Sequence, residues 1–205
     1  MKRVAGRSMR MHGEDRRHAL VQAAFRQIAE RGFEGLRTRE VAAETGVNIA
    51  TLHYYFPTKE ALIRGVVAHA MGRFRTTLEP HGSPDHQLAN HLKALRTLLQ
   101  KEPAIRVVMG ELALRSARDA SLARILRESN DAWHDTLRGL LRRAVREGGL
   151  AKELDSDQAA SLMIATLTSI MALPTMSTAR RDQAFRELER WLKAGSVPDR
   201  SRTSN

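Results

Sequence analysis

The sequence has no cysteine among its 205 residues, and only 4 % of the residues are aromatic. The absence of cysteine excludes a disulfide framework, a thiol nucleophile and any zinc or iron–sulfur site with cysteine ligands. No alternating apolar–polar run of useful length is present, so no β-sheet is expected. The GxGxxG, P-loop, GxSxG and HExxH patterns are also missing. We therefore expect no enzyme, no cofactor and no metal site.

What the sequence does have is an excess of positive charge. Its 34 Lys and Arg outnumber 23 Asp and Glu, which gives a formal net charge of +11. A charge of this size favours a polyanionic partner such as nucleic acid or an anionic membrane. The excess is spread along the chain, because residues 1–69 carry 12 basic and 7 acidic side chains and the remainder carries 22 and 16. Charge alone therefore leaves open a soluble protein that is merely basic.

Two segments bear on membrane association. Residues 1–13 are basic, but no apolar stretch follows them, so they do not read as a signal peptide. Residues 158–179 are uncharged and long enough to span a bilayer, but they contain many Ser and Thr residues and Pro174. We expect a fully buried helix here, no membrane contact and a cytoplasmic protein.

Almost the whole sequence has helical periodicity, which predicts an all-α protein of about nine helices. Gly and Pro residues mark the ends of these helices, and the clearest break lies at residues 81–84. The predicted organisation is a DNA-binding domain at 12–58, a connecting helix at 59–80, a second helical domain at 85–195, and flexible tails at 1–11 and 196–205.

The strongest motif lies between Glu34 and Lys59. Two short helices, about 37–45 and 48–55, flank a turn at Gly46, as in a helix-turn-helix. Asn48 is a good N-cap for the second helix. The buried side is expected to hold Val41, Ala42, Val47 and Leu52. The exposed side of the second helix would then carry Ala50, Thr51, His53, Tyr54 and Tyr55, and it could enter a major groove.

The stretch GFEGLRTREVAAETGVNIATLHYYFPTKEAL, residues 32–62, resembles the DNA-binding domain of tetracycline-repressor-type (TetR-family) regulators. That family has a Gly-aromatic pair, an "IA…AGV" helix and turn, a "TLYxYF" recognition helix and an "xSKEAL" helix start. The resemblance covers about residues 12–75. It implies an N-terminal three-helix helix-turn-helix domain followed by a C-terminal helical bundle for ligand binding and dimerisation.

The resemblance also implies roles for single residues. Arg39 would reach a base edge, for which guanine suits its fork, and Thr38 would hold a phosphate. Four residues would face the groove: Ile49, Ala50, His53 and Tyr54. Three would hold the DNA backbone: Thr51, Tyr55 and Lys59. Arg37 and Asn48 complete the predicted DNA-binding set. This chain departs from the family at Arg37, where an N-cap Ser or Thr is usual, and at His53, where the family has Tyr.

Each of these residues has a simpler alternative. Arg39 could be a solvated charge, and Ile49 could be buried because it lies three residues before Leu52. Tyr55 and Phe56 could belong to the core alone. The basic residues before the first helix could grip the duplex or form a solvated tail: Lys2, Arg3, Arg7 and Arg10.

Three histidines recur every five residues: His81, His86 and His91. Five residues turn a helix by about 140° beyond a full turn, so these side chains cannot share a face as metal ligands. We expect them on the helix surface.

The second domain is expected to dimerise and to bind a ligand. The uncharged helix, about 158–173, has no polar face, so either a second subunit or the same chain covers it. We expect a homodimer through the last two helices. The effector is expected to be a small apolar or amphipathic molecule. The residues that could line its cavity could equally belong to an ordinary core: Met109, Leu112, Trp133, Leu137, Met163, Thr166, Leu167 and Ile170.

The resulting prediction is a repressor that a small molecule releases from a palindromic operator in double-stranded DNA. The alternatives are an activator, a regulator that responds to a protein, or a basic helical interaction module without operator specificity.

Overall fold

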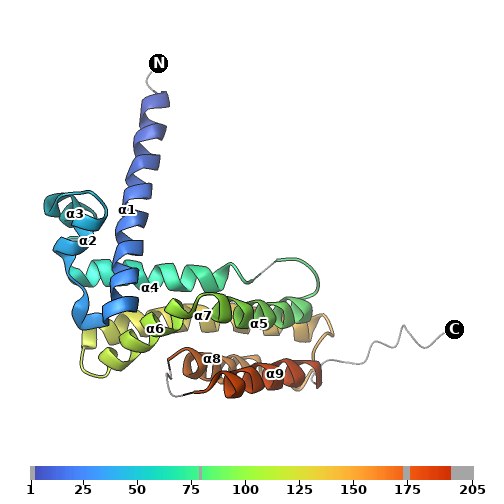
Figure 1. Ribbon diagram of the computed structural model, residues 1–205. Helices are drawn as coiled ribbons and strands as arrows, with labels where there is room; N and C mark the ends of the chain where they lie inside the picture. The colour runs from blue at the N-terminus through green and yellow to red at the C-terminus, as the bar shows by residue number, and fades with distance from the viewer. Residues whose placement is uncertain (1–2, 79, 173–175, 195–205) are drawn as a thin grey trace. The chain divides into compact units, whose positions relative to one another are not determined.

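The computed structural model describes residues 3–78, 80–172 and 176–194. Helices account for most of this described part, and it contains no strand, which confirms the predicted all-α class (Figure 1). The elements in chain order are α1 (Arg3–Arg31), the 3₁₀ turn η1 (Phe33–Gly35), α2 (Thr38–Glu44), α3 (Ile49–Tyr55), α4 (Lys59–Arg75), α5 (Pro84–Lys101), α6 (Pro103–Ser116), α7 (Ala120–Arg146), α8 (Ser156–Ala172) and α9 (Thr178–Ala194).

Helix α1 begins earlier than predicted. Its backbone is helical from Arg3, within the segment expected as a flexible tail, residues 1–11. The apolar stripe used to recognise the helix begins only near Leu20, so periodicity could not locate the earlier turns. Residues 1–2 and the predicted tail at 196–205 lie outside the described residues.

The chain divides into two compact units. The first contains residues 1–72 and 104–126, and the second contains residues 73–103 and 127–205. The division falls inside α4, after the first residue of α6 and inside α7.

In the first unit, α1 packs against η1 and α2, and α2 packs against α3. The apolar stripe of α1, with Leu20, Ala24 and Ile28, is fully buried. Helix α1 ends at Gly32, whose φ of 71° lies in the left-handed region that glycine tolerates. The amide of the next residue, Phe33, donates a hydrogen bond of 3.1 Å to Glu111 in α6. This contact fixes the chain where it turns from α1 into the helix-turn-helix.

In the second unit, α9 packs against both α5 and α8. An ion pair of 2.9 Å joins Arg96 of α5 to Asp182 of α9. The hydrogen bond from Arg96 lowers the pKa of Asp182. The buried apolar residues of these three helices include Leu92 of α5, Met163 of α8 and Phe185 of α9.

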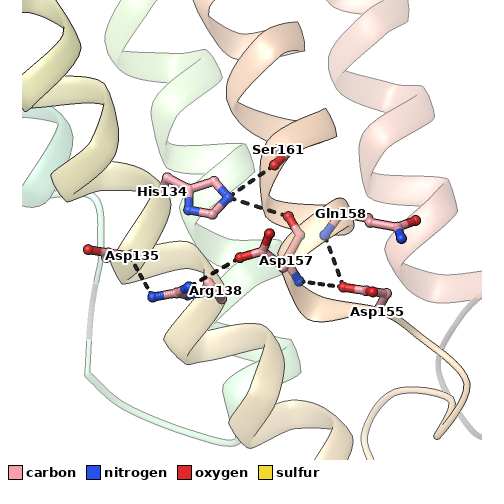
Figure 2. A network of polar contacts seen from close by, with 7 residues as sticks. All are labelled: His134, Asp135, Arg138, Asp155, Asp157, Gln158 and Ser161. Carbon is pink, nitrogen blue, oxygen red and sulfur yellow. Dashed lines mark hydrogen bonds and ion pairs between the residues drawn. The ribbon is translucent and has the colours of Figure 1, made fainter.

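A polar network joins α7 to the start of α8 (Figure 2). The side chain of Asp155 accepts hydrogen bonds from the backbone N–H groups of Asp157 and Gln158, and it thereby caps the N-terminus of α8. Arg138 reaches Asp135 on its own helix and Asp157 on α8. His134 contacts Ser161 of α8, so the side chains of the neighbouring residues His134 and Asp135 point apart.

Within the single chain, helix α8 is not fully buried. Six of its side chains are exposed: Asp157 at its start, and five uncharged residues that we call the α8 outer face, namely Gln158, Ser161, Leu162, Ala165 and Ser169. The opposite side, with Met163 and Leu167, is buried. None of the helices that the structure describes is both long and apolar enough to cross a membrane.

The prediction for the three histidines is wrong at His91. His86 is exposed on α5, and His81 is exposed but precedes that helix. His91 is fully buried. It lies three residues after Leu88 and four before Leu95, so it shares their apolar stripe. Its polar type, not its position, led to the wrong expectation.

Candidate nucleic-acid interface

The recognition helix α3 is held by its N-cap and by the turn before it. Asn48 Oδ1 accepts hydrogen bonds from the backbone N–H of Thr51 at 2.7 Å and from its hydroxyl at 2.9 Å. This confirms the predicted cap. Gly46, with φ of 68°, gives the turn the left-handed residue it needs. Leu52 is buried and anchors α3 on the first unit.

The outward side of α3 carries the side chains expected to face a groove. Tyr54 is 81 % exposed and Ile49 is 36 % exposed, and Ala50 and His53 are also exposed. Burial of Ile49, the alternative left open by the sequence, does not occur. A seven-residue helix is only about 10 Å long, so it fits within a major groove about 12 Å wide.

Two of the predicted contact residues of α3, Thr51 and Tyr55, are only partly exposed. Tyr55 is half-buried, and its ring meets the ring of Tyr54 edge to face at 5.2 Å. Phe56 is buried and belongs to the core. The hydroxyl of Thr51 already donates to Asn48, so only its lone pairs are open to a further partner. The open surface of α3 therefore consists of Ile49, Ala50, His53 and Tyr54.

Charge comes to this surface from α2 and not from α3. Arg39 is exposed and makes no ion pair within the described part of the chain. The two acidic residues that follow it are neutralised by α1, because Glu40 pairs with Arg31 at 2.5 Å and Glu44 pairs with Arg26 at 2.6 Å. These pairs reduce the repulsion that α2 would otherwise exert on a phosphate backbone.

The N-terminus of α2 lacks a side-chain cap, as the departure at Arg37 predicts. Arg37 makes no capping hydrogen bond. Its guanidinium donates instead to the carbonyl oxygen of Glu34, and its backbone N–H donates to Gln27 of α1 at 3.2 Å. Thr38, the first residue of α2, is half-buried. Arg37 is thus held beside the helix-turn-helix by backbone contacts.

Lys59 is exposed at the start of α4, but its ammonium group has a partner. It lies 4.8 Å from the centre of the Phe33 ring, and the guanidinium of Arg115 lies 5.3 Å from the same ring. Such cation–π contacts are worth about 0.5–1 kcal/mol at exposed sites. A phosphate could therefore draw Lys59 away from the ring at small cost.

An open cleft of about 490 Å³ lies beside the end of α3, and sequence reasoning missed it. It is lined by Arg17, Tyr55, Phe56, Thr58, Glu60, Ala61, Arg64, Gly65 and Ala68. The guanidinium of Arg17 lies 5.0 Å from the centre of the Phe56 ring, which holds a positive charge from α1 next to the recognition helix. No local pattern in α1 marks Arg17, because this contact joins residues far apart in the sequence.

The predicted effector-lining residues are divided between the two units. Met109 and Leu112 belong to the first unit, and the other six belong to the second. Thr166 is half-exposed, and its hydroxyl donates to the carbonyl of Leu162 in its own helix. The remaining five are buried in the second unit: Trp133, Leu137, Met163, Leu167 and Ile170.

Comparison with known proteins identifies the family. The profile described as "Bacterial regulatory proteins, tetR family" matches residues 20–66, and the profile "Tetracyclin repressor-like, C-terminal domain" matches residues 78–188. The second match alone covers more than half of the chain. The chain belongs to the TetR family of bacterial regulatory proteins. The family consists of DNA-binding transcriptional regulators, so the class predicted from the motif is confirmed.

The TetR relatives are distant in sequence. The transcriptional regulator PksA of Bacillus subtilis is 30 % identical over 60 % of this chain and 58 % of its own length. The dual regulator CecR of Shigella flexneri is 32 % identical over 55 % and 45 %. The chain therefore spans about half the length of these two relatives. The fatty acid metabolism regulator of Bacillus subtilis is 23 % identical over 80 % of this chain and 85 % of its own.

Solved TetR structures share the fold. A regulator from Rhodococcus sp. superposes with a TM-score of 0.78 at 22 % identity, over 90 % of this chain and all of its own. One from Haloarcula marismortui gives 0.77 at 19 % identity, with the same coverage. At these identities the likeness establishes the TetR fold and nothing about ligand or operator.

Proposed function

We propose that this TetR-family chain is a repressor that binds a palindromic operator as a homodimer and is released by a small molecule. The observation that carries the DNA-binding part is the α3 surface. It is a short, capped helix with exposed Ile49, Ala50, His53 and Tyr54, flanked by the exposed Arg39. Curated relatives include a transcriptional repressor, KstR2 of Mycobacterium tuberculosis, at 26 % identity.

Dimerisation is supported by the α8 outer face. It presents Ser161, Leu162 and Ala165 to solvent, and Leu162 is 53 % exposed. From Gln158 to the end of α8 there is no charged side chain. A face that is uncharged and built from small and apolar residues is suited to close packing against a second helix. The charged outer side of α9, with Arg186 and Arg190, would form the rim.

A dimer is required by the size of the reading surface. One seven-residue helix contacts only a few base pairs. Two helices related by a twofold axis read half-sites about 34 Å apart, so operator affinity depends on the distance between them. A ligand that prefers another distance by about 1–3 kcal/mol weakens operator binding roughly 5–150-fold.

A gel-shift titration tests this function. The probe is the DNA immediately upstream of the chain's own coding region, competed with random DNA of the same length. Specific affinity is expected to exceed non-specific affinity by about a thousandfold or more. Equal affinity for both DNAs would contradict the proposal and support a basic interaction module. Binding downstream of the promoter favours repression, whereas binding upstream of it favours activation.

Arg39→Ala sharpens the same experiment. Loss of the guanidinium is expected to cost about 1–3 kcal/mol and to relax the choice at one base pair in each half-site. The matched control is Arg142→Ala, which removes an exposed arginine of α7 in the second unit. If Arg39→Ala lowers affinity for every sequence alike, Arg39 contacts phosphate and not a base.

A further inference from the structure

A group of aromatic and polar side chains is buried in the second unit, around His91. The ring of Phe74 stacks on Trp133 with centres 5.6 Å apart, and His91 meets Trp133 edge to face at 6.2 Å. Thr77, in the turn after α4, forms a hydrogen bond with His91, with 2.7 Å between the hydroxyl oxygen and Nδ1. His91 is 0 % exposed, and the other three side chains are also buried.

The protons in this group can be assigned. The Thr77 hydroxyl lies 2.6 Å from the carbonyl oxygen of Phe74 and donates its one proton there. Its oxygen must then accept from His91 Nδ1, so Nδ1 carries a proton. Burial lowers the pKa of His91 to about 4, so the ring is neutral near pH 7. A neutral ring protonated at Nδ1 leaves a lone pair on Nε2.

Two nitrogens of the group have no hydrogen-bond partner within the described residues, namely His91 Nε2 and Trp133 Nε1. A buried polar atom without a partner is costly, and native proteins rarely keep one without a reason. The two atoms are of opposite kind, since Nε2 accepts and the indole N–H donates. A hydroxyl group both donates and accepts, so it matches both atoms in kind, and the two rings that carry them lie with their centres 6.2 Å apart.

We propose that His91 and Trp133 form the polar end of an effector site that takes a neutral hydroxyl group on an aromatic or apolar body. The proposal rests on the proposed function only for the link from this site to DNA release. A carboxylate can only accept and would leave Nε2 unsatisfied, and an ammonium group can only donate and would leave the indole unsatisfied. The apolar faces of Phe74 and Trp133 suit the body of such a ligand.

Binding of simple probes to the full-length protein tests the chemistry. Phenol carries the hydroxyl on an aromatic ring, anisole keeps the ring but lacks the donor, toluene lacks both functions, and benzoate is charged. Trp191→Phe leaves Trp133 as the one tryptophan, because the chain has two, and its fluorescence reports occupancy. Phenol is expected to bind saturably in the millimolar range and about tenfold more tightly than anisole or toluene.

The variant His91→Phe removes the acceptor and keeps an apolar ring of similar size. The preference for phenol over anisole is expected to fall from about tenfold to about twofold or less. His86→Phe is the matched control, because His86 is exposed on the same helix, and it should keep the full preference. The comparison of the four probes uses the Trp191→Phe protein, so it does not depend on whether the His91→Phe and His86→Phe variants fold.

Three binding results would overturn the proposal: equal affinity for phenol and toluene, tighter binding of benzoate than of phenol, or an unchanged preference for phenol over anisole in His91→Phe. The absence of saturable phenol binding would also overturn it, and would mean that only a buried water satisfies the two nitrogens. A gel shift in parallel separates this site from the proposed function. Selective phenol binding without any change in operator affinity supports the site and contradicts ligand release. Specific operator binding without phenol binding contradicts the site alone.

Discussion

At the scale of single residues, His91 is the residue whose location was predicted wrongly from the sequence and whose surroundings the structure reveals. Position along α5 placed it on the buried stripe, but a histidine on an apolar face is unusual enough that the surface was the natural expectation. The hydroxyl of Thr77, which comes from the turn after α4, gives the buried ring a hydrogen-bond partner. That partner lies 14 residues away and outside α5, so no pattern within α5 could reveal it.

The buried neutral His91 predicts a stability that depends on pH. Its pKa is about 4 in the folded protein, against about 6.5 when exposed. Between these values the unfolded chain binds a proton that the folded chain does not. The stabilisation is therefore complete above about pH 6.5 and is lost as the pH falls towards 4. Urea unfolding should show a loss of about 2 kcal/mol between pH 7.5 and pH 5.

In His91→Phe, the loss of stability across this pH range should be smaller by about the same 2 kcal/mol. His86→Phe removes an exposed histidine of the same helix and should leave the wild-type slope. Equal slopes in wild type and His91→Phe would show that another group titrates in this range.

At the scale of helices, periodicity and the Gly and Pro residues were sufficient for much of the fold. The second helix of the motif, predicted at about 48–55, agrees with α3 to within one residue. Helix ends that are set by hydrogen bonds from side chains to the backbone were less predictable. Helix α4 ends at Arg75, earlier than the end at residue 80 predicted for the connecting helix, because the hydroxyls of Thr76 and Thr77 donate to the carbonyls of Arg73 and Phe74.

The candidate DNA surface could be predicted to the extent that it depends on one local motif. The helix-turn-helix spans a short stretch of chain, so its cap, turn and exposed side follow from spacing alone. Contacts that join distant segments could not be predicted from spacing. They are the cation–π pairs of Arg17 with Phe56 and of Lys59 with Phe33, and the hydrogen bond from Phe33 to Glu111. These depend on how α1, α4 and α6 pack within the first unit.

The N-cap of α3 gives a prediction for a whole helix. An isolated seven-residue helix is unstable, so α3 depends on Asn48 and on packing. Asn48→Ala should lower the free energy of unfolding by about 1 kcal/mol and weaken operator binding by several-fold in gel-shift titrations, because the reading surface frays.

Asp155→Ala is the matched control for this cap, since Asp155 caps α8 in the second unit with two similar hydrogen bonds. It should cost a similar amount of stability and leave operator affinity nearly unchanged. If both variants weaken DNA binding equally, general stability and not the shape of α3 controls recognition.

At the scale of the whole molecule, the question is what covers the α8 outer face. An uncharged helix reads from sequence as buried on all sides, and the sequence left open whether the same chain or a second copy buries it. Within the chain, α8 packs on α9 through its other side, and the outer face stays exposed. That arrangement favours a second copy of the chain, because a twofold contact places the same uncharged residues opposite one another.

Leu162→Glu tests this assembly. Leu162 is exposed in the single chain, so the substitution should leave the fold of the protomer intact, but in a dimer it would bury an unpaired charge. Sedimentation equilibrium at micromolar concentration should change from about 46 kDa, twice the 23.0 kDa chain mass, to the mass of one chain. Operator affinity should fall together with the mass, since the recognition helices of both protomers are needed for operator binding.

Leu114→Glu is the matched control, at a leucine of α6 that is 77 % exposed. This variant should stay dimeric and keep the operator affinity of the wild type. If the Leu162→Glu protein stays dimeric and binds the operator as the wild type does, the protomers associate through a surface other than the α8 outer face.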